Sequence, residues 1–477
     1  MKNLLKLLVS LTLIFAFTVL SCPNDPAPAK SVAGKGSIKR GVGYNFTTAN
    51  SSPTAKSTTQ WTDEEMHLLA SGENPVKWFY AWGVKPNAAV PPVSAKYGVL
   101  YFPMVWNNNY REEDIREIVN NTKPRPEYIL AYNEPNFRKQ ANMTPAAAAA
   151  AWPRLKTIAK ELNLKIISPA MNFSGGSESM GWDNPLDWLD AFFKQPGVSK
   201  DDVHAIAIHA YPYYPGSLKY FVELYKEKFN KPIWVTEFCG WEISADDSSP
   251  SSVERQISYL QQAIVYLELD PMVERYAWYI PKGHEPENKP PHHNLLTDVP
   301  LNSPAAPVLT NLGFIYVNMT VCDKTRWDAT GSGQKIDASQ FTDCNISEHI
   351  GKVDSWSTFV LTNITLDSDK SAGWLEINTF KEKQWVEYQI TVPKTKDYTL
   401  TFRYKTKDLS GAGRSVNLLV SVDGGEAETI VLPYTDDEYS TSSSSVKVKV
   451  PSGKHTLRFT APSPASLPLA INWFSLK

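Results

Sequence analysis

Short apolar runs that end in polar or aromatic residues recur along the first two thirds of the chain. Stretches with helical spacing of apolar positions lie between them, so strands and helices are predicted to alternate. The apolar character of each run is continuous, which favours parallel strands covered on both faces over half-exposed antiparallel ones. The eight runs are residues 38–46, 76–84, 98–107, 128–136, 165–173, 204–213, 231–241 and 275–281.

The clearest helical segment is residues 144–162, which contain an alanine tract of high helix propensity. Thr144 fits the N-cap of this helix and Pro145 its first helical position. The other segments with helical spacing are residues 185–195, 217–229, 251–269 and 305–319.

Eight strands alternating with helices over about 280 residues predict an α/β fold of the TIM-barrel type, (β/α)8. The alternative is a doubly wound open sheet, which usually carries a glycine-rich phosphate turn after its first strand. Here the first run ends in "GVGYNF", which lacks the third glycine and leads into a Ser/Thr-rich loop. The barrel is therefore favoured.

After Cys322 the pattern changes to short runs of alternating polarity separated by turn residues. The segment Asp423-Gly424-Gly425 is a hairpin signal between two such runs. This pattern predicts a C-terminal all-β sandwich. We expect a (β/α)8 catalytic domain at 37–325, a linker at 326–334 and the sandwich at 335–477.

The N-terminus has the features of an export signal. Two lysines precede an apolar run that is too short and too terminal to be a spanning helix, so residues 1–21 are predicted to be a signal peptide. The run ends in Val19-Leu20-Ser21-Cys22, which resembles a bacterial lipobox and predicts a lipid anchor on Cys22. The alternative is an ordinary signal peptide that contains a cysteine. Residues 22–36 have the composition of a flexible tether.

Composition narrows the range of partners. A formal net charge of −2 argues against a nucleic-acid partner, which would need a basic excess.

Cys322 and Cys344 either pair or remain apart, and Cys239 is expected to be a buried thiol. The cysteine spacing does not resemble a zinc site, and the adjacent His292 and His293 do not suit a single ion, so no metal is expected.

Candidate chemistry lies at the carboxyl ends of the predicted strands, where barrel enzymes carry their active sites. Two ends carry a carboxylate, Glu134 after the fourth run and Glu237 after the seventh. Glycosidic cleavage requires two carboxyl groups, one protonated to give the leaving oxygen a proton and one ionised to attack the sugar or activate water. Each charge raises its neighbour's affinity for a proton, and no cofactor is needed.

Other polar and aromatic residues at the strand ends are candidates for holding a sugar. Asn133 can bond a sugar hydroxyl beside the reacting carbon, and His209 or Tyr211 can tune the carboxylates. The predicted substrate-binding residues are Asn133, Tyr80, Trp82, Trp106, Asn107, His209, Tyr211, Trp241 and Trp278.

"NEP" at the fourth strand end and "TEF" at the seventh resemble the clan A glycoside hydrolases. Together with "GVGYNF", "WFYAWG", "FPMVW" and "HAYPYY", they are most similar to glycoside hydrolase family 128, over about residues 37–318. The resemblance implies an endo-β-1,3-glucanase that retains anomeric configuration and acts on laminarin-like or fungal β-glucan. It implies Glu237 as nucleophile and Glu134 as acid/base.

The C-terminal "KIDASQF" and "INWFSLK" resemble carbohydrate-binding module family 6. Ser339 stands where that family often has an acidic residue tied to calcium, so calcium is not expected. Trp356, Trp374 and Trp385 are candidate sugar platforms.

The sequence thus predicts a secreted, lipid-anchored endo-β-1,3-glucanase at the outer membrane or cell surface, and we expect a monomer. One alternative keeps the chemistry and changes the polysaccharide to mannan, cellulose or mixed-linkage glucan. The other is a surface glycan-binding lipoprotein without activity.

Overall fold

The computed structural model describes most of the chain beyond residue 36. The described residues are 37–46, 58–173, 177–212, 214–240, 253–282, 292–297, 306–345, 363–366, 375–380, 383–406, 415–435, 440–462 and 467–477. The predicted signal peptide and tether, and with them Cys22, lie outside this set. Among the residues that are described, every helix is too short or too polar to cross a lipid bilayer.

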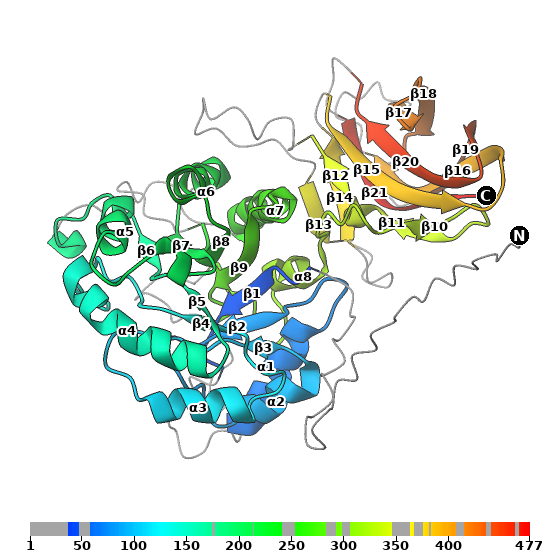
Figure 1. The fold of residues 1–477 in the computed structure, drawn as a ribbon. Helices are drawn as coiled ribbons and strands as arrows, with labels where there is room; N and C mark the ends of the chain where they lie inside the picture. Colours follow the sequence, from blue (N-terminus) through cyan, green and yellow to red (C-terminus); the bar gives the residue numbers. More distant parts are fainter. Residues whose placement is uncertain are drawn as a thin grey trace, which may run out of the picture. The chain divides into compact units, whose positions relative to one another are not determined.

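Each of the eight predicted apolar runs overlaps a strand, and the helices lie outside these strands (Figure 1). The fifth run contains two short strands, so nine strands are present in this part. The strands are β1 (Arg40–Gly43), β2 (Trp78–Tyr80), β3 (Leu100–Tyr101), β4 (Tyr128–Leu130), β5 (Lys165–Ile167), β6 (Met171–Asn172), β7 (Ile206–Ala210), β8 (Ile233–Phe238) and β9 (Val273–Tyr279).

The helices that the sequence predicts are confirmed, with one shifted start. Thr144 caps its helix by accepting a hydrogen bond from the Ala147 amide. The last predicted helix begins only after Thr310, whose side chain accepts from the Gly313 amide. These helices are α4 (Pro145–Glu161), α5 (Pro185–Phe193), α6 (Pro215–Phe229), α7 (Val253–Leu269) and α8 (Asn311–Asn318), and three further ones are α1 (Thr58–Ala70), α2 (Val90–Tyr97) and α3 (Glu112–Asn121).

The strands are parallel, which confirms an α/β fold with a parallel sheet. Seven of them form one sheet in the order β3-β2-β1-β9-β8-β7-β6, and β4 and β5 form a separate pair. Single bridges, Met104 to Leu130 and Ile167 to Ala205, connect this pair to its neighbours on either side. Because the ladder is not continuous there, closure into an eight-stranded barrel stays a prediction.

Alternate residues of each strand point to opposite sides, and both sides are apolar. Trp78, Tyr80 and Trp234 belong to a cluster formed by the strands themselves, on the side of the sheet away from the helices. Phe79 and Val235 belong to the larger core that includes helix residues. Because both sides of the strands are buried, the runs are continuously apolar in the sequence. Successive side chains at the strand ends therefore face opposite sides of the sheet.

The C-terminal part is all-β, as predicted. One sheet has the order β10-β15-β20-β17-β18 with β12 beside β15, and the other has the order β13-β14-β21-β16-β19 with β11 beside β21. Aromatic rings of the two sheets pack against each other: the ring centroid of Tyr388 in one sheet lies 4.6 Å from that of Phe474 in the other. The strands are β10 (Asp328–Ala329), β11 (Lys335–Asp337), β12 (Asp343–Cys344), β13 (Asn363–Leu366), β14 (Leu375–Phe380), β15 (Trp385–Val392), β16 (Lys396–Thr406), β17 (Ser415–Val422), β18 (Glu428–Pro433), β19 (Ser440–Val450), β20 (Gly453–Thr460) and β21 (Leu467–Leu476).

Two details refine the predicted boundaries and cysteine chemistry. β10 lies within the predicted linker and pairs in parallel with β15, so sheet structure begins at Asp328. Cys239, Cys322 and Cys344 are buried thiols without a disulfide among them. Burial raises the pKa of the Cys322 thiol, and the neighbouring Cys344 raises it further.

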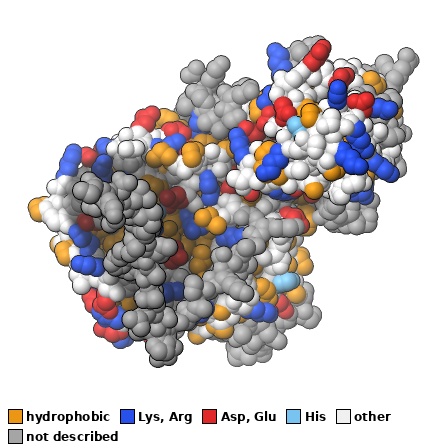
Figure 2. Space-filling view, turned by 45° about the vertical axis from the view of Figure 1, so that its right-hand side comes forward, with side chains coloured by type: hydrophobic (Ala, Val, Ile, Leu, Met, Phe, Trp, Pro, Cys, Tyr) orange, Lys and Arg blue, Asp and Glu red, His pale blue; other side chains and the backbone are white. Residues whose placement is uncertain are grey.

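Charged side chains of both signs are interspersed over the described surface drawn in Figure 2. On that face, the described residues therefore do not form a large field of a single sign.

The packing of α8 predicts a position that tolerates only glycine. A Cβ on Gly313 would lie 1.9 Å from the backbone oxygen of Leu295. We expect Gly313→Ala to destabilise the fold by about 1–3 kcal/mol and to lower the Tm by several degrees. Gly83→Ala is the control, because its new methyl group would lie 3.7 Å from the nearest atom. Equal melting temperatures of the two variants would contradict the close approach.

Candidate active site

Glu134 directly follows β4, and the backbone around it is held by both neighbouring segments. The Asn133 amide donates to the Trp106 oxygen and the Glu134 amide donates to the Ala170 oxygen, each at 2.9 Å. Glu134 has a φ of 42°, in the left-handed region that few non-glycine residues adopt. The two lateral hydrogen bonds hold this backbone, and Glu134 is 5% exposed.

Glu237 lies in β8, one residue before its end, and pairs in register with His209 of β7. A register irregularity between Ile208 and His209 precedes this pair. Glu237 is 4% exposed and His209 is 1% exposed. Neighbouring strands thus bring a buried carboxylate and a buried imidazole side by side.

The structure brings both predicted carboxylates to one place. One oxygen of Glu134, one oxygen of Glu237 and a ring nitrogen of His209 all lie within 4.8 Å of one another. The His209 Nδ1 lies 2.7 Å from Glu134 Oε1 and 3.3 Å from Glu237 Oε2. Among the described residues, this trio is the group whose donor atoms are arranged to hold a metal ion.

Three side-chain donors converge on the Glu237 carboxylate. Tyr80 Oη and Trp82 Nε1 each donate to Oε1 at 2.6 Å. Tyr211 Oη donates to Oε2. Hydrogen bonds from such donors stabilise a negative charge on a carboxylate and fix its orientation. Both oxygens of Glu237 are therefore engaged.

Glu134 is held differently, because its contacts fall on one oxygen. Asn172 Nδ2 donates to Oε1 at 2.9 Å, and His209 Nδ1 also lies against Oε1. Within the described parts of the chain, no hydrogen bond is formed by Oε2. One oxygen is thus anchored while the other is available to a ligand.

The two carboxylates change the ionisation of the groups around them. Burial alone lowers the pKa of His209, but the charges of Glu237 and Glu134 outweigh burial and raise that pKa above its ordinary value. Burial, and then the charge of Glu237, raise the pKa values of Tyr80 and Tyr211 well above the usual range. Both hydroxyls therefore stay protonated and act as donors.

The remaining predicted residues have different positions. Asn133 is buried, its Nδ2 donates to Gln140 Oε1 at 3.1 Å, and its Oδ1 has no partner among the described groups. Trp106 is half-buried beside both apolar clusters. Asn107 accepts from the Asn109 amide in a local turn. Trp241 lies outside the described residues.

Trp278, predicted to contact sugar, is instead part of the core. It is fully buried, its ring packs against Phe238 and Tyr316, and its indole donates to the His293 oxygen. The physical reason is strand alternation, which turns the side chain of Trp278 toward the helices. The prediction is therefore wrong in its choice of residue.

The sequence reasoning missed two residues at the site. Tyr279, one position after Trp278, is half-buried and lies against Trp82 and Tyr211, with ring centroids 5.9 and 5.3 Å away. Asn172 reaches Glu134 from the end of β6. A period-two pattern counted forward from Ala277 would have indicated Tyr279.

In the C-terminal part, Trp385 is the one candidate platform among the described residues. It is 7% exposed, and the Arg458 guanidinium lies 4.0 Å from its ring centroid. Trp356 and Trp374 lie outside the described residues. The ring of Trp385 is therefore covered by a neighbouring side chain.

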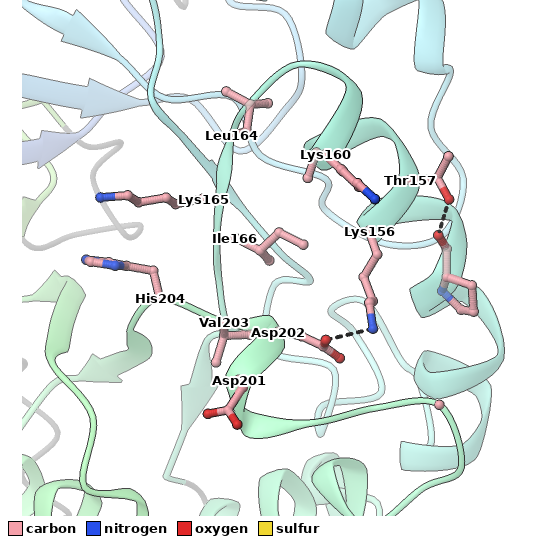
Figure 3. A pocket seen from close by; sticks show the side chains of 13 residues that line it. Lys156, Thr157, Lys160, Leu164, Lys165, Ile166, Asp201, Asp202, Val203 and His204 are labelled. Carbon is pink, nitrogen blue, oxygen red and sulfur yellow. Dashed lines mark hydrogen bonds and ion pairs between the residues drawn. The ribbon is translucent and has the colours of Figure 1, made fainter. Parts of the chain in front are cut away.

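A separate cavity of about 610 Å³ lies at the other end of the strands, where β5 begins and the chain enters β7 (Figure 3). Its rim includes the Lys156–Asp202 ion pair at 2.6 Å. His204 lies in its lining and contacts Glu274 through Nε2 at 2.7 Å. The carboxylates of Glu134 and Glu237 are not among its lining residues.

Comparison with known families identifies the part of the chain that holds this site. The family model described as the glycosyl hydrolase catalytic core matches residues 49–316. Alkali-sensitive linkage protein 1 of Schizosaccharomyces pombe is 27% identical over 161 residues, which cover 32% of this chain and 27% of that protein. The chain thus matches about a quarter of the length of this relative.

Solved structures are similar to more than half of this chain. A subgroup II endo-β-1,3-glucanase of family 128 from Sorangium cellulosum is 31% identical, with 58% of this chain and 97% of that chain covered and a TM-score of 0.46. One from Pseudomonas viridiflava is 30% identical, with 59% and 98% covered and a TM-score of 0.47.

The electrostatics of His209 predict a pH-dependent stability. Because its pKa is raised in the fold, the contact with the carboxylates stabilises the protein fully below the unfolded value of about 6.5 and is lost as pH rises through the folded value. We expect the Tm of the wild type to fall relative to that of His209→Gln as pH rises from about 6.5 to 9. A Tm difference that stays constant across this range would contradict the prediction.

Proposed function

This chain belongs to the family of glycosyl hydrolase catalytic cores and is a glycoside hydrolase, and we propose that it is a retaining endo-β-1,3-glucanase. Glu237 attacks the anomeric carbon. Glu134 protonates the leaving sugar and then takes a proton from water. The observation that carries the proposal is the approach of these two buried carboxylates within one cluster of 4.8 Å.

The separation of the carboxylates supports retention of configuration. In retaining enzymes the two carboxyl groups are about 5–5.5 Å apart, whereas inverting enzymes leave about 6.5–9.5 Å for a water molecule. The limit of 4.8 Å between oxygens of Glu134 and Glu237 suits the shorter class. No room for an intervening water is needed, because the carboxylate itself forms the first bond.

The hydrogen bonds support the assignment of roles. A nucleophile must be ionised and fixed, and both oxygens of Glu237 accept from Tyr80, Trp82 or Tyr211. An acid/base needs one oxygen directed to the leaving group, and Glu134 is held only through Oε1. Exchange of a proton at Oε2 leaves the anchoring contacts of Oε1 in place.

The aromatic rings around Glu237 support a sugar as the ligand. Tyr80, Trp82, Tyr279 and Tyr211 form a sequence of neighbouring edge-to-face contacts, with centroids between 5.3 and 5.9 Å apart. Trp82, Tyr279 and Tyr211 are only partly buried. Such rings offer flat apolar faces to the C–H groups of a pyranose, while the hydroxyls of Tyr80 and Tyr211 and the indole N–H of Trp82 hold the nucleophile.

The β-1,3-glucan substrate is proposed from the relatives of this chain. The family 128 proteins from Sorangium cellulosum and Pseudomonas viridiflava are described as endo-β-1,3-glucanases, and at 30% identity or more they align over nearly their whole length. Mannan, cellulose and mixed-linkage glucan are the alternative substrates that the assay must include.

We expect the wild type to release reducing sugar from laminarin and curdlan more rapidly than from mannan or carboxymethyl-cellulose. Glu237→Gln should lose at least about 10³-fold in kcat, because no covalent intermediate can form. Glu134→Gln should lose about 10²–10⁴-fold, and less with a dinitrophenyl leaving group that needs no proton. Glu274→Gln, which alters a carboxylate paired with another histidine, is the control.

Two results would contradict this reading. Equal activity of wild type and Glu237→Gln on laminarin would exclude Glu237 as the nucleophile. Proton NMR of the first products must show the β-anomer, and an initial α-anomer would contradict retention.

We also propose that Cys22 carries the lipid that anchors the enzyme to the membrane. The apolar segment before Val19-Leu20-Ser21-Cys22 supports this proposal. In bacteria grown with labelled palmitate, we expect the wild type to be labelled and Cys22→Ala to remain unlabelled and in the soluble fraction. Equal labelling of both would contradict the anchor.

A further inference from the structure

The carboxylates of Glu134 and Glu237 share an unbalanced negative charge. The side chains of Glu134 and Glu237 are 7% and 5% exposed, and their ionic partner in the described structure is His209. Among the described residues, no lysine or arginine pairs with either of them. Two anions in a buried site without a fixed cation attract a small cation strongly, because the local dielectric constant is low.

The donor atoms of the trio also match the preferences of a particular class of ion. Glu134 and Glu237 offer carboxylate oxygens, and His209 offers the Nδ1 nitrogen between them. Zinc binds such nitrogen and oxygen donors at about 2.0–2.2 Å, which sets neighbouring ligands about 3.3 Å apart in a tetrahedron. The observed separations from Nδ1 are 2.7 and 3.3 Å, and all three donor atoms lie within 4.8 Å of one another, so a small shift of the side chains brings them around one ion.

The surrounding hydrogen bonds resemble the outer shell of a metal centre. Ligating carboxylates are usually held by further donors, which orient them and raise affinity. Tyr80, Trp82 and Tyr211 do this for Glu237, and Asn172 does it for Glu134. These donors keep the two carboxylates in place while an ion enters between them.

We propose that Glu134, His209 and Glu237 bind one divalent transition-metal ion, Zn²⁺, in a site that sugar and metal occupy alternately. Mg²⁺ and Ca²⁺ do not fit, because they prefer six or more oxygen ligands. Three protein ligands leave a fourth tetrahedral position to water. The ion engages both carboxylates, so it blocks nucleophilic attack and proton donation together and inhibits hydrolysis reversibly.

Metal binding does not depend on the proposed glucanase activity, so it can be measured without substrate. Zn²⁺ is titrated by calorimetry into the full chain after treatment with a chelator, and Co²⁺ binding is followed by its visible absorption. We expect one ion per chain at this site, with the intense bands typical of four-coordinate cobalt. Mg²⁺ and Ca²⁺ should give no heat at the same concentrations.

Variants locate the ion. His209→Gln removes the nitrogen ligand and Glu237→Gln removes a charged oxygen ligand, and each should weaken Zn²⁺ binding at least about 10-fold. The matched control is His204→Gln, since His204 is a part-buried histidine that contacts the single carboxylate of Glu274. It should bind Zn²⁺ like the wild type. Melting curves of all variants identify any loss of Zn²⁺ binding that comes from unfolding.

The outcomes separate this proposal from the proposed function. If folded His209→Gln and Glu237→Gln bind Zn²⁺ as tightly as the wild type, or if the wild type binds none at millimolar Zn²⁺, the metal site is overturned while glucan hydrolysis stands. Displacement of Co²⁺ by laminarihexaose supports the shared site. If Co²⁺ stays bound when laminarihexaose is added, the metal site stands. That result counts against binding of the sugar between Glu134 and Glu237.

Discussion

The close approach of two buried carboxylates is the constraint around which the site is organised. Like charges within 4.8 Å repel each other in a medium of low dielectric constant, so the fold must supply compensating groups. It does so with the imidazole of His209 between them and with donors from several strands. These donors are distributed unevenly, and that asymmetry gives two chemically identical side chains different environments.

The parallel strands make this arrangement possible because they end at a common edge. β7 and β8 carry His209 and Glu237 in register, while the chain after β4 brings Glu134 to the same place. Tyr80 at the end of β2 and Trp82 just beyond it both reach Glu237, although β1 and β9 lie between β2 and β8 in the sheet. A sheet of this kind therefore assembles residues that are separated by more than a hundred positions in sequence.

The sequence was informative where chemistry and strand position coincide. Glu134 and Glu237 were identified because a carboxylate after a buried apolar run has few structural explanations. Trp278 was misassigned because a continuous apolar run hides which side each residue faces, and its neighbour Tyr279 is the residue that lies against Tyr211 beside Glu237. Asn172 was not assigned a role, since its contact with Glu134 depends on the lateral pairing of separate strands. The pair β4-β5 is connected to its neighbours by single bridges, which no pattern of apolar residues specifies, so the sequence could not have predicted this break in the ladder.

The left-handed backbone at Trp82 and Glu134, with φ of 50° and 42°, has a consequence for protein engineering. Each of these residues presents a functional side chain from a conformation that most side chains disfavour. Transplanting the same residues onto another scaffold with relaxed loops would direct the indole and the carboxyl group elsewhere. A designer who wishes to copy this chemistry must therefore graft the main chain of both loops, together with the lateral hydrogen bonds that hold it.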